Sequence, residues 1–186
     1  MKNLKFIFLA KVLLKREIDF GNPEAVIYQC VERAYRDMMI GARYCFSGEK
    51  ETCCRKFIEI LNKNHYEFSR EMIEETTALF GNEEVIRKDN KYVTRYGLSQ
   101  KLVNMTYKYL FVFYDYIDKE IDFSDCDCPL DSIILEKTLN SDAKWTKITK
   151  EKYVFYQEKI SDLLRQTELD DEIKDIGNLA FDFLNW

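Results

Sequence analysis

Apolar side chains recur every three or four positions along most of this chain, which is the spacing of amphipathic helices rather than of strands. The clearest helix is predicted over 23–43, where Asn22 can cap the first turn and Pro23 suits the first helical position. The same spacing predicts further helices over 52–61, 62–81, 99–116, 129–139, 150–165 and 171–184. The third of these ends at Gly81, a residue type that commonly follows the last turn of a helix.

Two stretches do not show this helical spacing. Residues 82–96 are polar and are predicted to form a connection, with a few packing points at Val85, Ile86, Tyr92 and Val93. Residues 1–16 hold an apolar run that Lys11 interrupts, and no small-residue cleavage site follows it. This pattern favours a buried first element over a signal peptide, and the run is too short to cross a bilayer. We therefore expect a cytoplasmic protein that does not contact a membrane.

The composition agrees with long helices joined by short connections. Only 6 Gly and 2 Pro occur among 186 residues, whereas an all-β domain needs more turn residues. Hydrophobic residues make up 46% of the chain, enough for one core, and no repeat or linker divides it. The expected fold is all-α, a single domain over 1–186 built as a bundle of about seven or eight helices.

The cysteines and the single histidine offer little for metal or nucleophile chemistry. Neither the pair Cys53-Cys54 nor the pair Cys126-x-Cys128 has the repeated C-x₂-C spacing of structural zinc sites. His65 has no partner motif around it, and no P-loop or dinucleotide fingerprint is present. We expect reduced, mostly buried thiols and predict no metal and no cofactor; zinc held by the two cysteine pairs stays the alternative.

Positive charge is concentrated in one segment of an acidic chain. The net charge is −5, yet residues 87–108 contain one acidic residue and a run of basic ones: Arg87, Lys88, Lys91, Arg95, Lys101 and Lys108. A basic segment of this kind can contact phosphate. The alternative is a solvated face, or internal pairing with the acidic last third of the chain.

The predicted helix 99–116 contains the most specific candidate chemistry. Gly97 permits a turn before the helix, and Ser99 can cap it, which would leave backbone N–H groups free to hold an anion. One face of the helix is apolar, and the opposite face would present an amide and two lysines to solvent or ligand: Lys101, Asn104 and Lys108. The alternative is a capped amphipathic helix whose lysines are merely solvated.

A carboxylate at the start of the next predicted helix is the second candidate. Pro129 suits the first helical position, so Asp131 falls in the first turn, where N–H groups and the helix dipole keep a carboxylate ionised. An ionised Asp131 beside a ligand could stabilise a developing cation. Acidic residues are equally favoured in first turns for stability alone.

Together these two motifs resemble the helix-hairpin-helix DNA glycosylase superfamily. The run from Gly97 to Lys101 is similar to that family's hairpin and its lysine, with Ser99 in place of the second hairpin glycine, and Pro129-Leu130-Asp131 is similar to its P-V-D segment. The resemblance covers about residues 95–139. It implies an all-helical protein with a helix-hairpin-helix element that acts on duplex DNA.

The resemblance also implies roles for individual residues. Lys101 would be the amine nucleophile that forms a Schiff base with the sugar, and Asp131 would stabilise the oxocarbenium-like sugar. Gly97, Ser99, Arg95 and Lys108 would contact DNA phosphates.

The same segment also resembles small bacterial proteins of unassigned function, which would imply no activity. In that case the chain would be a non-enzymatic interaction module, with homodimerisation possible through its apolar C-terminal helix.

Overall fold

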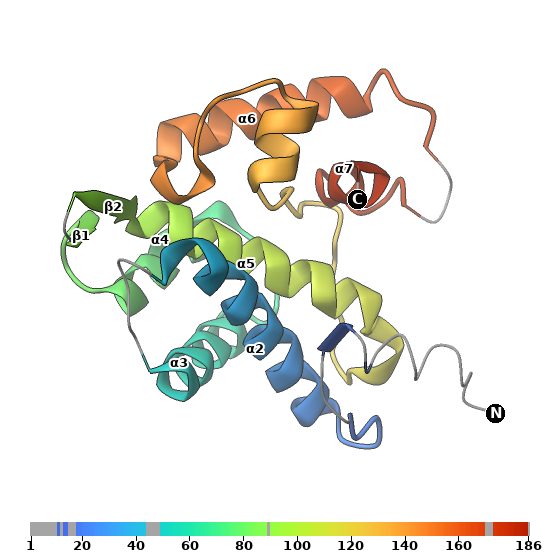
Figure 1. Cartoon of the computed structure of the whole chain (residues 1–186). Coiled ribbons are helices and arrows are strands. Elements are labelled where there is room, and N and C mark those ends of the chain that lie inside the picture. Colours follow the sequence, from blue (N-terminus) through green and yellow to red (C-terminus); the bar gives the residue numbers. More distant parts are fainter. Residues whose placement is uncertain are drawn as a thin grey trace.

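Helix α5 (Arg95–Val112) runs through the middle of the molecule, and the other helices pack around it (Figure 1). The computed structural model describes residues 11, 13–14, 18–43, 49–88, 90–169 and 173–185. Helices α2 (Pro23–Ala42) and α3 (Lys50–Lys63) lie on one side of α5, and α6 (Lys150–Leu164) and α7 (Leu179–Asn185) lie on the other (Figure 1). The short helix α4 (Arg70–Thr76) also contacts α5.

Side chains that cap helix ends explain several of the predicted boundaries. The Asn22 side chain accepts a hydrogen bond from the Ala25 N–H at 3.2 Å, and Pro23 occupies the first turn of α2. Thr149 caps α6 in the same way. The helices predicted over 23–43, 52–61 and 150–165 are thereby confirmed as α2, α3 and α6, each within a few residues of the predicted ends.

Two predicted helices are shorter than expected. The segment 62–81 is broken after α3 by a turn in which His65 and Tyr66 have positive φ, before α4 and the 3₁₀ helix η1 (Thr77–Phe80), which ends at Gly81. The prediction of one helix there is wrong because the Ser69 side chain caps a new helix by accepting from the Met72 N–H at 3.1 Å. Likewise, α7 begins only at Leu179 rather than near 171.

A two-stranded antiparallel hairpin replaces the connection predicted over 82–96. Strand β1 (Val85–Lys88) pairs with β2 (Lys91–Thr94), with Ile86 opposite Val93 and Arg87 opposite Tyr92. The fold is therefore a largely helical single domain, as predicted, with a small hairpin that the all-α prediction lacks. The physical reason is local: β-branched and aromatic residues on both sides of a short polar turn favour strand pairing.

Helix α5 begins four residues earlier than predicted. Thr94, not Ser99, is the cap, and its hydroxyl accepts from the Gly97 N–H at 3.0 Å. Gly97 is inside the first turn of α5, and the hairpin β1–β2 leads directly into this helix. No helix-hairpin-helix element is present in the part of the chain that the structure describes.

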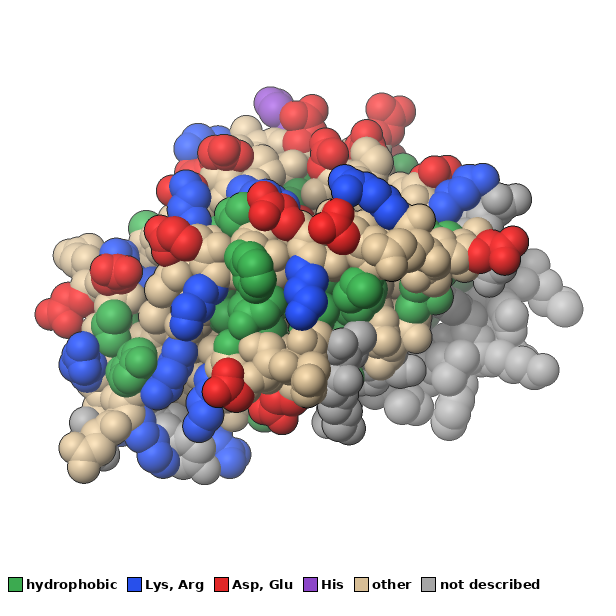
Figure 2. Space-filling model, turned by 90° about the horizontal axis from the view of Figure 1, so that it is seen from above, with side chains coloured by type: hydrophobic (Ala, Val, Ile, Leu, Met, Phe, Trp, Pro, Cys, Tyr) green, Lys and Arg blue, Asp and Glu red, His purple; other side chains and the backbone are tan. Residues whose placement is uncertain are grey.

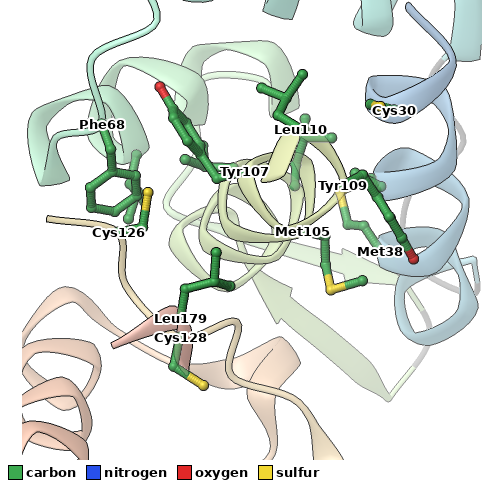
Figure 3. Close-up of a cluster of buried hydrophobic side chains, with 14 of the residues drawn as sticks. Cys30, Met38, Phe68, Met105, Tyr107, Tyr109, Leu110, Cys126, Cys128 and Leu179 are labelled. Carbon is green, nitrogen blue, oxygen red and sulfur yellow. The ribbon is translucent and has the colours of Figure 1, made fainter. Parts of the chain in front are cut away.

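Helix α5 has no solvent-facing side over most of its length. Every residue from Tyr96 to Leu110 is buried, so the face with Lys101, Asn104 and Lys108 is not presented to solvent, and the alternative of merely solvated lysines is wrong. Figure 3 shows side chains of α5 projecting in several directions, with Tyr107 toward Phe68 and Tyr109 toward the Met38 side of α2. The Phe68 and Tyr107 rings meet edge to face at 5.2 Å between centroids. A helix buried all round needs neighbours on every side, which the two groups of helices supply.

The first and last segments are covered only in part. The element predicted over 1–16 lies outside the described residues except for Lys11, Leu13 and Leu14, of which Leu14 is buried. Within α7, Leu179, Ala180 and Phe181 are buried, which confirms that this helix docks on the core. Among the described residues, no helix has both the length and the apolar character needed to span a membrane.

Candidate amine pocket on helix α5

An extended segment, residues 126–131, lies beside α5 and is held there by two buried side-chain amides. The Gln157 amide accepts from the Cys128 N–H at 3.0 Å and donates to the Cys128 carbonyl at 2.7 Å. The Gln100 amide makes the same pair of bonds with Leu130, at 3.2 and 3.0 Å. The two amides thus take the place of a neighbouring strand, and they satisfy backbone groups that water cannot reach.

This arrangement brings Asp131 against Lys101, the residue that follows Gln100 on α5. The Lys101 Nζ lies 3.1 Å from the Asp131 Oδ2, and the Lys101 side chain is only 6% exposed. The Asp131 Oδ1 accepts from the N–H groups of Ile133 and Ile134 at 2.9 and 3.0 Å. Asp131 therefore precedes the short helix η3 (Ile133–Thr138) and does not lie inside its first turn, contrary to the prediction of a helix from Pro129.

The surroundings of Asp131 favour its ionised form. Burial alone would raise the pKa of Asp131, but the Lys101 ammonium and the N–H groups of Ile134 and Ile133 outweigh it, so the pKa lies below its usual value. Because folding lowers this pKa, Asp131 contributes stability that is fully present above the ordinary carboxyl pKa and is lost as the pH falls through the lowered one.

We expect Asp131→Asn to lower the free energy of unfolding by about 2–3 kcal/mol at neutral pH, because a buried lysine loses its charged partner. The difference in the free energy of unfolding between the variant and wild type should become smaller below about pH 4, where the wild-type carboxylate takes up a proton and loses its charge. Urea titrations at several pH values measure it, with the exposed Asp118→Asn as control. A difference that stays constant down to about pH 3 would contradict the assigned ion pair.

A second buried lysine–aspartate pair lies along the same side of α5. Lys108 is seven residues after Lys101, so the two side chains share a helix face. Its ammonium pairs with the carboxylate of Asp182 on α7, whose side chain is fully buried. Burial raises the pKa of Asp182 above its usual value, although Lys108 acts in the opposite direction.

Both lysines line a pocket of about 630 Å³ whose walls are mainly apolar. Trp145 and Phe183 lie near the two ammonium groups, with the Lys101 Nζ 6.0 Å from the indole centroid and the Lys108 Nζ 5.6 Å from the phenyl centroid. The volume falls in the range of pockets that hold small organic ligands. Apolar and polar side chains complete the lining, among them Ile40, Met105, Val112, Arg33, Asp37 and Tyr109.

A polar cluster forms part of the pocket wall. The Tyr109 hydroxyl donates to Asp37, and Arg33 pairs with Asp37 at 3.0 Å. Burial, reinforced by the Asp37 charge, raises the pKa of Tyr109, which keeps its phenol protonated at neutral pH. The pocket therefore offers a neutral hydroxyl, that of Tyr109, and charged side chains that are each paired with a side chain of opposite charge.

Comparison with models of protein families, with curated proteins and with solved structures gives no match to this chain.

Two glycines let Trp145 reach the pocket wall. The 3₁₀ helix η4 (Trp145–Lys147) packs against both α5 and β2. A Cβ added at Gly41 of α2 would lie 2.2 Å from the indole ring, and one at Gly97 would lie 2.7 Å from the Trp145 carbonyl. Neither position leaves space for a side chain. Gly97, singled out in the sequence as a turn residue, instead allows this close approach.

The residues predicted to contact phosphate do not gather at one place. Lys108 lines the same pocket as Lys101, but Gly97 and Ser99 are buried and use their polar groups within α5. The Arg95 side chain donates to the Gly81 carbonyl and lines a different pocket.

None of the five cysteines that the structure describes lines the pocket. In the described part of the chain, Cys30, Cys53, Cys54, Cys126 and Cys128 are all buried, and burial raises the pKa of Cys53 to about 12. Such thiols are poor nucleophiles at neutral pH. Among the described residues, no group of three or more His, Cys, Asp or Glu side chains is placed to hold a metal ion.

Sequence reasoning missed Asp182, Trp145 and the two bridging glutamines. The seven-residue spacing of Lys101 and Lys108 is a usable signal, because it places both on one face of a helix whose remaining residues are mostly apolar. Nothing local marks Asp182 or Gln157 as partners, since each pairs with a residue far away in the sequence.

Proposed function

We propose that this protein binds DNA and performs amine chemistry on a damaged nucleotide, with Lys101 as nucleophile and Asp131 as the stabilising carboxylate. The observation that carries the proposal is the Lys101–Asp131 pair, with 3.1 Å between Nζ and Oδ2, in the wall of a mainly apolar pocket. A lysine in a desolvated, apolar pocket can act as an amine nucleophile and form a Schiff base. The sequence resemblance of residues 95–139 to DNA glycosylases names the same two residues, although the run from Gly97 to Lys101 lies inside α5 and forms no hairpin.

The simplest reaction of this type begins at an abasic site. After the Lys101 ammonium gives up a proton to water, the free amine would add to the C1′ aldehyde of the ring-opened sugar. The carbinolamine takes back a proton from water and loses one water molecule, which leaves a protonated imine. A water molecule then removes a proton from C2′, the C3′–O bond breaks, and the 3′ phosphate leaves with the electron pair of that bond. Water finally hydrolyses the imine and releases Lys101.

In this reaction Asp131 would act as a fixed negative charge. Its lowered pKa keeps it ionised at neutral pH, so it would stabilise the iminium cation that replaces the ammonium next to it. The two N–H groups bonded to Oδ1 hold the carboxylate in position. The pocket volume of about 630 Å³ leaves space for a nucleotide that is turned out of the duplex.

Borohydride trapping on duplex DNA with one abasic site tests the proposal. Wild type should form a covalent adduct, and both Lys101→Ala and Lys101→Arg should form none. Arginine retains the charge opposite Asp131 and protects the fold, but it cannot form the imine. Lys152→Ala, which removes an exposed lysine, should trap as wild type does. Absence of trapping by folded wild type, or trapping by Lys101→Arg at the wild-type level, would refute the role of Lys101.

A second candidate function is a non-enzymatic interaction module. The observation that favours it is Ile40, which lines the pocket yet is 70% exposed. An apolar rim of this kind suits an apolar side chain of a protein partner, and the internally paired lysines would then serve the fold only. Folded protein that neither traps nor binds DNA would leave this candidate in place of the first.

A further inference from the structure

A basic surface lies on the hairpin β1–β2 and on η4, apart from the buried lysines of the pocket. Tyr92 on β2 is at its centre. The Lys147 Nζ lies 3.9 Å from the centroid of the Tyr92 ring, and the Arg87 guanidinium carbon lies 5.5 Å from it. We call the five basic residues on and beside these elements the hairpin surface: Arg87, Lys88, Lys91, Lys144 and Lys147.

Four of the five basic residues of this surface differ from the pocket lysines in their pairing with described carboxylates. Within the described residues, Arg87, Lys88, Lys144 and Lys147 form no ion pair with a carboxylate, whereas Lys101 and Lys108 each do. Lys88 also stands directly opposite Lys91 in the β-ladder, and like charges in that position destabilise a hairpin. Figure 2 shows Lys and Arg side chains gathered at the end of the molecule where Figure 1 places the hairpin.

The hairpin surface adjoins the pocket through η4. Trp145, the first residue of η4, lines the pocket beside Lys101, and Lys147, the last, contacts Tyr92 on the hairpin. A ligand on the hairpin surface therefore lies next to one wall of the pocket. The aromatic ring of Tyr92 positions cations from two separate segments on one surface.

We infer that the hairpin surface binds the phosphate backbone of duplex DNA and places the duplex over the pocket. A two-stranded ribbon is one of the few elements that fit the major groove, and basic side chains on its rim reach the phosphates. Several cations that pair with no described carboxylate, at one end of an acidic molecule, orient a polyanion toward that end. Binding of the duplex by the hairpin surface does not depend on Lys101. The placement of the duplex over the pocket rests on the proposed function.

Fluorescence anisotropy with a labelled duplex tests the inference. Arg87→Gln/Lys88→Gln/Lys147→Gln should weaken binding about tenfold or more in low salt and reduce the slope of log K against log salt by about 2 to 3, near 0.9 for each phosphate that is no longer neutralised. The matched control is Lys56→Gln/Lys119→Gln/Arg165→Gln, which removes the same charge from exposed positions on other elements and should change binding much less. Circular dichroism verifies that both variants are folded.

Each outcome has a defined meaning. Equal losses of affinity in the two triple variants would show attraction by overall charge only and would overturn the inference, as would a wild type that binds no duplex at low salt. Tighter binding of poly-glutamate than of duplex would assign the surface to an acidic protein partner instead. Trapping at an abasic site in low salt separates the two proposals: wild type that binds duplex through this surface but does not trap would refute only the chemistry of Lys101.

Discussion

Asp182→Ala is expected to lower the free energy of unfolding by about 3–5 kcal/mol, because it leaves the buried Lys108 ammonium without its carboxylate. Asp182 is fully buried and the Lys108 side chain is 9% exposed, so water cannot replace the missing partner. For a domain of this size such a change is a large part of the total stability. Urea unfolding followed by far-UV circular dichroism measures it.

A double variant distinguishes removal of the ion pair from removal of packing. Lys108→Met/Asp182→Leu replaces both charges by apolar groups of similar volume, and it should recover most of the stability that Asp182→Ala loses. Asp162→Ala, which breaks an exposed pair with Arg165, should change stability by about 1 kcal/mol or less. A double variant as unstable as the single one would mean that Asp182 acts through packing or through other groups and not through Lys108.

The parts of the fold that could be predicted are those whose causes are local. Asn22 and Pro23 fix the start of α2 within a few neighbouring residues, and the predicted helix agrees with the structure at both ends to within one residue. The hairpin is also a local feature, but it was not predicted. The few apolar residues of 82–96 fit a loop with some packed side chains as well as they fit two short paired strands.

The surroundings of α5 could not be predicted because they depend on distant segments. Its lysines look solvated in the sequence, since lysine on a helix is usually exposed. In the structure these lysines are covered by α2, α7 and η4, and each of these elements is distant from α5 in the sequence. The sequence does single out Lys101 and Asp131 as a candidate pair, and the structure places them in contact; their chemical role stays a prediction.

The contact between Lys101 and Asp131 depends on Gln100, and Gln100→Leu provides the second large effect. The substitution keeps the side-chain volume but leaves the N–H and carbonyl of Leu130 buried without partners. Each such group costs about 1–3 kcal/mol, so we expect a decrease of about 2–6 kcal/mol in the free energy of unfolding. Gln166→Leu, at an exposed position after α6, should have little effect.

A local readout shows whether Gln100→Leu acts through the extended segment 126–131. Cys128 is fully buried two residues before Leu130, and the neighbouring Gln157 holds its backbone. If the segment loosens from α5, the Cys128 thiol should react with a maleimide faster than in wild type under native conditions, as measured by mass spectrometry of the Cys128 peptide. Labelling of Cys30 on α2 should not change, because that thiol is on the opposite side of α5 (Figure 3). Equal acceleration at both cysteines would mean general unfolding. Selective acceleration at Cys128 would show that a buried amide on α5 controls where the carboxylate of Asp131 lies, and therefore whether Lys101 has a partner.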